Sequence, residues 1–229
     1  PLSTILVYSL VFSVFFRAAP PVAGNGSQNF AVFLFTGLVV WLLFAGMING
    51  SMGWLIAIGD LRRKVFFPPE TAIFGSALAL AVQSAIEAGV LVVVMLLIGN
   101  LGPTTLVLPL VLVLAGIFGL GIGFFVCVLN THYRDMQYLV GIVLNAVFFL
   151  VPIVYPLGII PERHWGLPIR RLVELNPINQ FVTAARESAY LLQWPSFTRW
   201  CTLLCYSIVV FALGWRFFAH RSMQLSEDM

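Results

Sequence analysis

The chain has 229 residues, of which 60% are hydrophobic and only 9% are charged. A soluble globular domain carries about 25% charged residues, so this chain has too little charge to cover a water-facing surface. Intrinsic disorder, a disulfide-stapled secreted domain and a soluble enzyme are excluded, and a net charge of +3 implies no nucleic-acid partner. Several continuous apolar runs reach the roughly 20 residues that a bilayer-crossing helix needs, which predicts an all-α membrane protein.

Six apolar segments predict six transmembrane helices in a single membrane domain, residues 1–229. Apolar sequence begins at the first residue, and residues 1–16 would rise only about 22 Å against a hydrocarbon core of roughly 30 Å. We therefore expect a first span whose beginning, with a preceding cytoplasmic segment, lies before residue 1. The predicted spans are about residues 1–16, 30–52, 71–98, 105–129, 136–156 and 197–218.

The polar connections carry the charges that normally set orientation. Residues 53–70 hold Arg62, Arg63 and Lys64 and end in Pro68-Pro69, which can open the next helix. Residues 130–135 form a second short polar turn. Counting Lys and Arg gives six on each side of the membrane, so charge bias alone does not orient the chain.

Residues 157–196 are too charged to span a bilayer and too few to form a soluble domain. They predict two amphipathic helices, about Pro161–Leu175 and Pro177–Leu192, that lie at the interface or dip into it where protein shields the backbone. Asn176 is placed to cap the second helix, with Pro177 at its first position.

Enzyme signatures are missing from the sequence. It contains no HExxH, GxSxG or GxxxxGK[ST] motif, and Lys64 is its only lysine. The chain therefore cannot hydrolyse ATP by the P-loop mechanism, and any energy must come from another subunit. Cys201 and Cys205 share one helical face without a nearby histidine or carboxylate, so we expect packing residues and no metal site.

Glu87 is the one acidic residue inside a predicted span. Gln83 precedes it by one helical turn, so both side chains lie on the same face. A charge at this depth is costly unless it is paired, protonated or beside water. Glu87 either faces a lumen or gate, or makes a structural hydrogen bond to a neighbouring segment.

Aromatic residues follow helical spacing on two spans, Tyr8, Phe12 and Phe15 on the first and Phe148 and Tyr155 on the fifth. Such faces could line a passage for sugars, because apolar sugar faces stack on rings. The alternative is ordinary packing or contact with lipid. The Arg62–Lys64 cluster also has two interpretations, as cytoplasmic flanking charge or as a short interfacial helix that docks on a partner.

The motifs together resemble the polysaccharide-export permeases of ABC transporters, which move O-antigen, teichoic acid or galactan chains. Asn130-Thr-His-Tyr-Arg-Asp-Met-Gln is similar to the family's asparagine and aromatic-Arg-Asp turn, and Phe148–Pro156 to its "P-I-hydrophobic-Y" stretch. Leu175-Asn-Pro177 with Arg186 resembles its "NP…R" pattern, and Lys64–Glu70 its "K-V-aromatic-F-P-x-E" loop. Glu87 matches an acidic position of the third span, and Pro68-Pro69 departs from the pattern.

This resemblance implies a homodimer in the bacterial inner membrane with two cytoplasmic ATPase subunits, which bind ATP and Mg; no cofactor is expected on this chain. It implies cytoplasmic loops and an extracytoplasmic pair of gate helices within residues 157–196, with Asn176, Pro177 and Arg186 in the gate region. Spans one and five would face the central passage. The implied coupling helix contains Asp60, Leu61, Arg62, Arg63, Lys64, Val65 and Phe66. The implied contact for an anionic polyprenyl carrier contains His132, Tyr133, Arg134 and Asp135.

Two other functions remain open from the sequence. A related permease could move a small lipid or a drug in place of a lipid-linked polysaccharide. A membrane-embedded transferase acting on lipid-linked sugars would require essential carboxylates, for which Glu87 and Asp135 are the candidates.

Overall fold

The computed structural model describes residues 20–57, 69–133, 135–162 and 168–222, and these contain helices and turns without a β-strand. Four helices are long and apolar enough to cross a membrane: α2 (Phe30–Ala57), α4 (Pro69–Leu97), α5 (Leu108–His132) and α9 (Phe197–Ser222). They correspond to the predicted second, third, fourth and sixth spans. The predicted first span, residues 1–16, lies outside the described residues.

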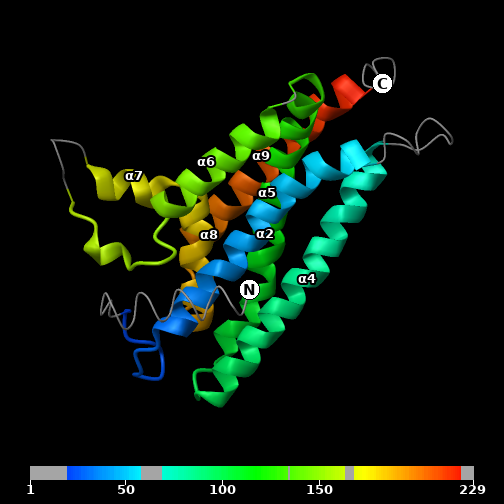
Figure 1. Ribbon diagram of the computed structural model, residues 1–229. Helices are drawn as coiled ribbons and strands as arrows, with labels where there is room; N and C mark the ends of the chain where they lie inside the picture. The colour runs from blue at the N-terminus through cyan, green and yellow to red at the C-terminus, as the bar shows by residue number, and fades with distance from the viewer. Residues whose placement is uncertain (1–19, 58–68, 134, 163–167, 223–229) are drawn as a thin grey trace.

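Helices α2 and α5 form the centre of the bundle, with α9 beside α5 and α4 at the edge (Figure 1). The close approach of α5 to α2 and to α9 depends on glycines on two faces of α5. Gly119 lies against the α2 backbone, where an added Cβ would sit 3.0 Å from the Phe44 carbonyl oxygen. Gly121 faces α9, and a Cβ at Gly214 would collide with the Gly121 carbonyl oxygen. Small residues at such crossings let helix backbones pack closely in lipid.

The aromatic core fills the remaining space between these helices. Phe124 of α5 is fully buried and its ring centroid lies 5.2 Å from that of Trp215 and 5.1 Å from that of Phe218, both on α9. Phe44 of α2 stacks on Phe118 of α5 at 5.7 Å. These contacts fix the relative rotation of the three helices and therefore the direction in which the shorter elements project.

Short elements occupy the connections of the bundle. A 3₁₀ turn, η2 (Pro103–Val107), precedes α5, and α6 (Met136–Leu150) follows it. A second 3₁₀ turn, η3 (Leu157–Ile159), leads toward α7 (Ile169–Leu175), α8 (Pro177–Ala185) and a π-helical turn, η4 (Arg186–Tyr190). The predicted pair of amphipathic helices is thus present in shorter form, because α7 begins at Ile169 and α8 gives way to η4 at Arg186.

The connection between α2 and α4 is shorter than the predicted connection, residues 53–70. Helix α2 continues to Ala57, and α4 begins at Pro69, as expected from the ability of proline to open a helix. The connection therefore narrows to residues 58–68, which lie outside the described residues.

Candidate functional site

Helix α6 ends six residues before the predicted end of the fifth span. The sequence predicts a span over residues 136–156, whereas the helix stops at Leu150 and Val151 is already extended, with φ −82° and ψ 131°. Pro152 explains the difference, because a proline disfavours helical geometry at the residue before it. At 15 residues α6 rises about 22 Å, so by itself it does not cross a hydrocarbon core of roughly 30 Å.

Arg186, predicted in the gate region, is buried beside the end of α6. Its Nη1 donates to the Pro152 carbonyl oxygen and its Nη2 to that of Ile153, both at 2.6 Å. The guanidinium carbon lies 3.6 Å from the ring centroid of Phe33 on α2. Burial lowers the pKa of Arg186 to about 9, with a smaller opposing effect from Tyr190, so the side chain stays charged at neutral pH.

The other end of η4 is fixed by loops from distant parts of the chain. The Tyr190 hydroxyl donates to the Pro21 carbonyl oxygen at 2.8 Å, and the Gly24 amide donates to the Tyr190 carbonyl oxygen at 3.0 Å. Asn100, which is fully buried, donates through Nδ2 to the Ala189 and Tyr190 carbonyl oxygens and accepts from the Asn25 amide. Burial raises the pKa of Tyr190, so its hydroxyl remains a donor.

The predicted start of the second amphipathic helix is confirmed. Asn176 caps α8 by accepting the Ile178 amide at 3.0 Å, and Pro177 occupies the first position of the helix. The cap satisfies an amide that has no partner within the helix. Helix α8 thus begins at a fixed residue and presents Phe181 and Val182 to the core.

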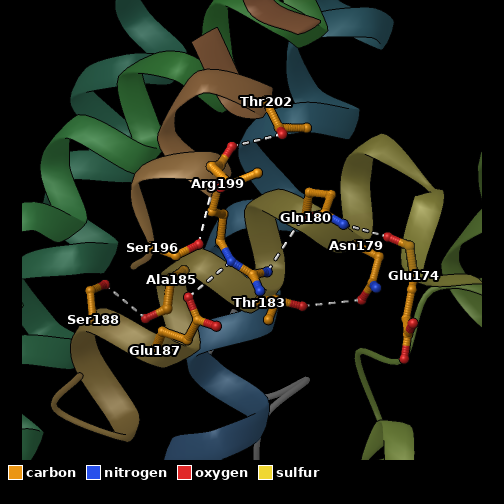
Figure 2. A network of polar contacts seen from close by, with 11 residues as sticks. Glu174, Asn179, Gln180, Thr183, Ala185, Glu187, Ser188, Ser196, Arg199 and Thr202 are labelled. Atoms are coloured by element: carbon orange, nitrogen blue, oxygen red, sulfur yellow. Dashed lines mark hydrogen bonds and ion pairs between the residues drawn. The ribbon is translucent and has the colours of Figure 1, made fainter. Parts of the chain in front are cut away.

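Arg199 joins α9 to α8 and η4, a contact that the sequence analysis missed. Figure 2 shows Arg199 between Glu187 and Gln180: Nε forms an ion pair with Glu187 Oε2 at 3.0 Å, and Nη1 donates to Gln180 Oε1 at 3.3 Å. Burial raises the pKa of Glu187, and the charge of Arg199 partly opposes this shift. The available signal was an arginine two residues inside the start of an apolar span, twelve residues after Glu187.

Phe148, which is predicted to line a passage, is buried in the bundle, 5.4 Å between ring centroids from Trp41 of α2. Its place at a passage stays a prediction. One helical position of 100° separates Phe148 from Phe149, which is 61% exposed. Tyr155 is half-buried, with its hydroxyl donating to the Phe149 carbonyl oxygen at 2.8 Å.

The exposed face of α6 combines aromatic and amide side chains. Tyr138, Ile142, Asn145 and Phe149 recur at helical spacing on this face, and all are exposed. We call these four residues the α6 stripe.

The turn between α5 and α6 contains the residues predicted to contact an anionic carrier. His132 ends α5, and its Nδ1 lies 3.0 Å from the Val128 carbonyl oxygen. Tyr133 is exposed, and Asp135 is the residue before α6 without a side-chain capping bond. Arg134 lies outside the described residues.

Glu87 and Gln83 share a face of α4, as predicted. Gln83 Nε2 donates to Glu87 Oε1 at 3.1 Å, and Glu87 is 8% exposed. This bond lies within one helix, so both interpretations of Glu87 remain: a structural hydrogen-bonding group, or an acid beside a passage.

A cavity of about 1080 Å³ lies between α4 and α5, with α2 at its back. Its α4 wall consists of small residues, which leave the space open. Ser84 contributes a hydroxyl that is buried without a hydrogen-bond partner among the described residues. The small residues of this wall are Ala77, Ala81, Ser84, Ala85, Ala88 and Gly89.

Several predicted site residues lie outside the described residues: the coupling residues Asp60–Phe66 and the aromatic residues Tyr8, Phe12 and Phe15 of the first span. Within the described ranges, no three histidine, cysteine or carboxylate side chains gather as metal ligands. Cys201 and Cys205 are exposed on α9, and Cys127 is buried.

The chain is similar in sequence to known bacterial transport proteins. The chain is 25% identical over 230 residues to the O-antigen export system permease protein RfbA of Myxococcus xanthus, covering 100% of this chain and 85% of the relative. RfbA of Klebsiella pneumoniae is 25% identical over 190 residues, covering 82% of this chain and 68% of that protein. The polysialic acid transport protein KpsM of Escherichia coli is 29% identical over 165 residues, covering 70% of this chain and 61% of that protein.

The family model for the ABC-2 type transporter matches residues 1–190. With its membrane-spanning helices and a match across most of its length, the chain belongs to the ABC-2 type transporter membrane family.

Proposed function

We propose that this chain is the transmembrane permease subunit of an ATP-driven exporter that moves a polyprenyl-diphosphate-linked polysaccharide across the bacterial inner membrane. The observation that carries the proposal is the alignment, over the whole chain, with a relative named for O-antigen export. The relative named for polysialic acid transport points to the same substrate class.

The α6 stripe supports a glycan as cargo. Aromatic rings stack on apolar sugar faces while an amide can hydrogen-bond hydroxyl groups, and Tyr138, Asn145 and Phe149 supply both on an exposed face. One copy of the bundle cannot enclose a polymer. We therefore propose a homodimer whose two-fold axis brings two α6 stripes to opposite sides of one passage.

Energy would come from two ATPase subunits bound at the cytoplasmic side, which carry ATP and Mg. The basic 58–68 connection offers a docking segment, and closure of the ATPases would move docked segments as rigid bodies. The nearby turn, with His132, Tyr133 and Arg134, would contact the anionic carrier. This chain would perform no chemistry of its own.

The proposal is tested in cells that lack the chromosomal copy of this gene and carry the full-length chain on a plasmid. Loss of the chain should abolish surface glycan and leave undecorated polymer inside. A Tyr138→Ala, Phe149→Ala double variant should export less than one-tenth as much, because the passage loses both rings. The control is Leu204→Ala with Leu213→Ala, which removes exposed apolar residues from α9. Normal surface glycan in cells without the chain would reject the function, and normal export by the α6 variant would reject the stripe.

The α4–α5 cavity favours a second candidate, a permease for a small lipid or an apolar drug. Its volume of about 1080 Å³ and its small apolar wall suit a hydrocarbon chain better than a sugar. Ala81→Phe with Ala85→Phe would fill the cavity. Loss of transport of a fluorescent lipid with unchanged glycan export would support this second cargo. A transferase is tested separately: full function after Glu87→Gln combined with Asp135→Asn would reject it.

A further inference from the structure

Arg186 connects three parts of the chain that are far apart in sequence: its own π-helical turn η4, the non-helical end of α6, and helix α2. We propose that Arg186 is the positioning residue that holds residues 151–155 against α2, so that the end of α6 and the gate segment α8–η4 form one rigid unit. Its effect on transport rests on the proposed function; its effect on the position of residues 151–155 does not.

The carbonyl groups bound by Arg186 are ones that a helix could not satisfy. In a continuous helix the Pro152 carbonyl would accept from the amide of residue 156, but Pro156 has no amide hydrogen. The Ile153 carbonyl loses its helical donor as well, because Val151 and Pro156 are both extended. In the low-dielectric interior an unmatched carbonyl is costly, and the two Nη groups supply the missing donors.

The surroundings of Arg186 favour arginine over lysine. Two donors in a planar fork reach two successive carbonyl oxygens, and the flat face of the guanidinium stacks on Phe33. Gly37 of α2 provides the space, since a Cβ there would lie 2.9 Å from Nη2 and 3.4 Å from Ile153 Cγ2. Among the described residues no carboxylate forms an ion pair with Arg186, so the carbonyl groups are its principal polar partners.

The far end of η4 is also held, which is why Arg186 can position α6 without moving itself. Tyr190 and Asn100 fix that end to the loops at residues 20–25 and 98–100. A residue that only filled space would leave residues 151–155 in place when replaced by an apolar side chain of similar length. A positioning residue would release them.

The test measures the reactivity of one buried thiol in the full-length chain, in membranes with its partner subunits. Ile153→Cys supplies the thiol, because this side chain is fully buried, and Cys127, Cys201 and Cys205 are replaced by alanine. N-ethylmaleimide is the probe. In this background Arg186→Met should raise the labelling rate at least tenfold, and Arg186→Lys should raise it less. Gly37→Ala should raise it several-fold, whereas Gly53→Ala, on the same helix with no atom near its Cβ, should leave it unchanged.

Labelling within twofold of the parent in both Arg186→Met and Gly37→Ala would overturn the proposal, as would equal rates for the two glycine variants. If Arg186→Met is not recovered folded by size-exclusion chromatography, the contrast between Gly37→Ala and Gly53→Ala decides. Glycan export is measured in parallel. Raised labelling together with reduced export is the result expected for Arg186→Met. Raised labelling in the variants, combined with normal surface glycan in cells that lack the chain, would reject the proposed function and retain the role of Arg186.

Discussion

Helices α4 and α9 expose equal shares of their most apolar stretches, yet they are attached to the bundle in different ways. Only 22% of that stretch is buried in each. Helix α9 meets α5 backbone to backbone at Gly121 and Gly214, and Ser207 donates to the Leu114 carbonyl oxygen at 2.9 Å. Helix α4 contacts α5 through the rings of Phe74 and Phe124, but elsewhere the cavity of about 1080 Å³ lies between the two helices. In lipid, apolar surface gives helices no reason to associate, so close packing and hydrogen bonds decide which pairs stay together.

Helix α4 is held at a few separate points. Leu80 lies over Gly46 and Gly50 of α2, the Phe74 ring contacts Phe124 of α5, and the turn after α4 is fixed to η4 by Asn100. Helix α9, in contrast, is held along its length and also at its start, by Arg199. The comparison predicts that substitutions along α9 disturb the bundle far more than substitutions along the α4 wall.

The largest effect is expected at the α5–α9 crossing. Gly121→Leu would place a Cβ 2.6 Å from the Phe211 backbone nitrogen, which cannot move without shifting α9. We expect a loss of at least about 3 kcal/mol in stability, at the upper end of overpacking effects. The measurement is thermal unfolding in detergent. Gly75→Ala on α4, with no atom within 4 Å of its Cβ, is the control and should unfold at or above the parent temperature.

Asn100→Ala should have the next largest effect, because it frees the end of α4 from η4. The change removes one acceptor and two donor contacts from a fully buried site. Leaving buried groups unmatched predicts a loss of about 2–4 kcal/mol. Asn25→Ala is the control, since its backbone amide can still reach Asn100 and the side-chain bonds that are lost, to Ile98 and Ser27, are exposed. Equal unfolding temperatures for the two variants would contradict this role of Asn100.

Glu187→Gln should change the pH dependence of the attachment at the start of α9. Burial raises the pKa of Glu187, so the folded state holds this proton more tightly than the unfolded chain. The stabilisation from this group is therefore complete below the ordinary glutamate pKa and is lost as pH rises through the raised pKa. The difference should stay below about 1 kcal/mol, because the site is partly solvated. Unfolding temperature measured between pH 4 and pH 8 should be flatter in Glu187→Gln; parallel curves would contradict the assignment.

The smallest effect is expected in the α4–α5 cavity. Ala81→Leu adds apolar volume to an open wall, so stability should stay within about 0.5 kcal/mol of the parent. Ala115→Leu is the matched variant in the packed core, at a position of α5 that is 1% exposed. The larger side chain has no free space there, so this variant should unfold at a clearly lower temperature than the parent. A large loss with Ala81→Leu would mean that α4 packs closely along its whole length.

The sequence was sufficient for features set by local chemistry. Apolar runs located α2, α4, α5 and α9, and the residue types at Pro69 and Asn176 predicted the starts of α4 and α8. The end of α6 was missed because Pro152 lies inside an apolar run that length alone assigns to a span. Composition alone also left the rotation of α6 open, because helix rotation is fixed only by contacts such as that of Phe148 with Trp41.

The interaction partners of the residues in the candidate site could be identified only from the three-dimensional structure. Arg186 was predicted in the gate region, but nothing local to it indicates the Pro152 and Ile153 carbonyl groups more than thirty residues away. Arg199 and Asn100 were also missed, because each is a single polar residue whose partners come from another element. A buried polar group can be suspected from sequence, whereas its partner depends on how helices cross.

Two prolines four residues apart make the early end of α6 robust to mutation. Replacing Pro152 alone leaves residue 156 unable to donate to the carbonyl one turn earlier, and replacing Pro156 alone leaves the ring of Pro152 against the preceding turn. A regular, fully hydrogen-bonded helix could therefore run through this point only after both prolines were replaced. A single substitution at either position leaves one of the two interruptions in place.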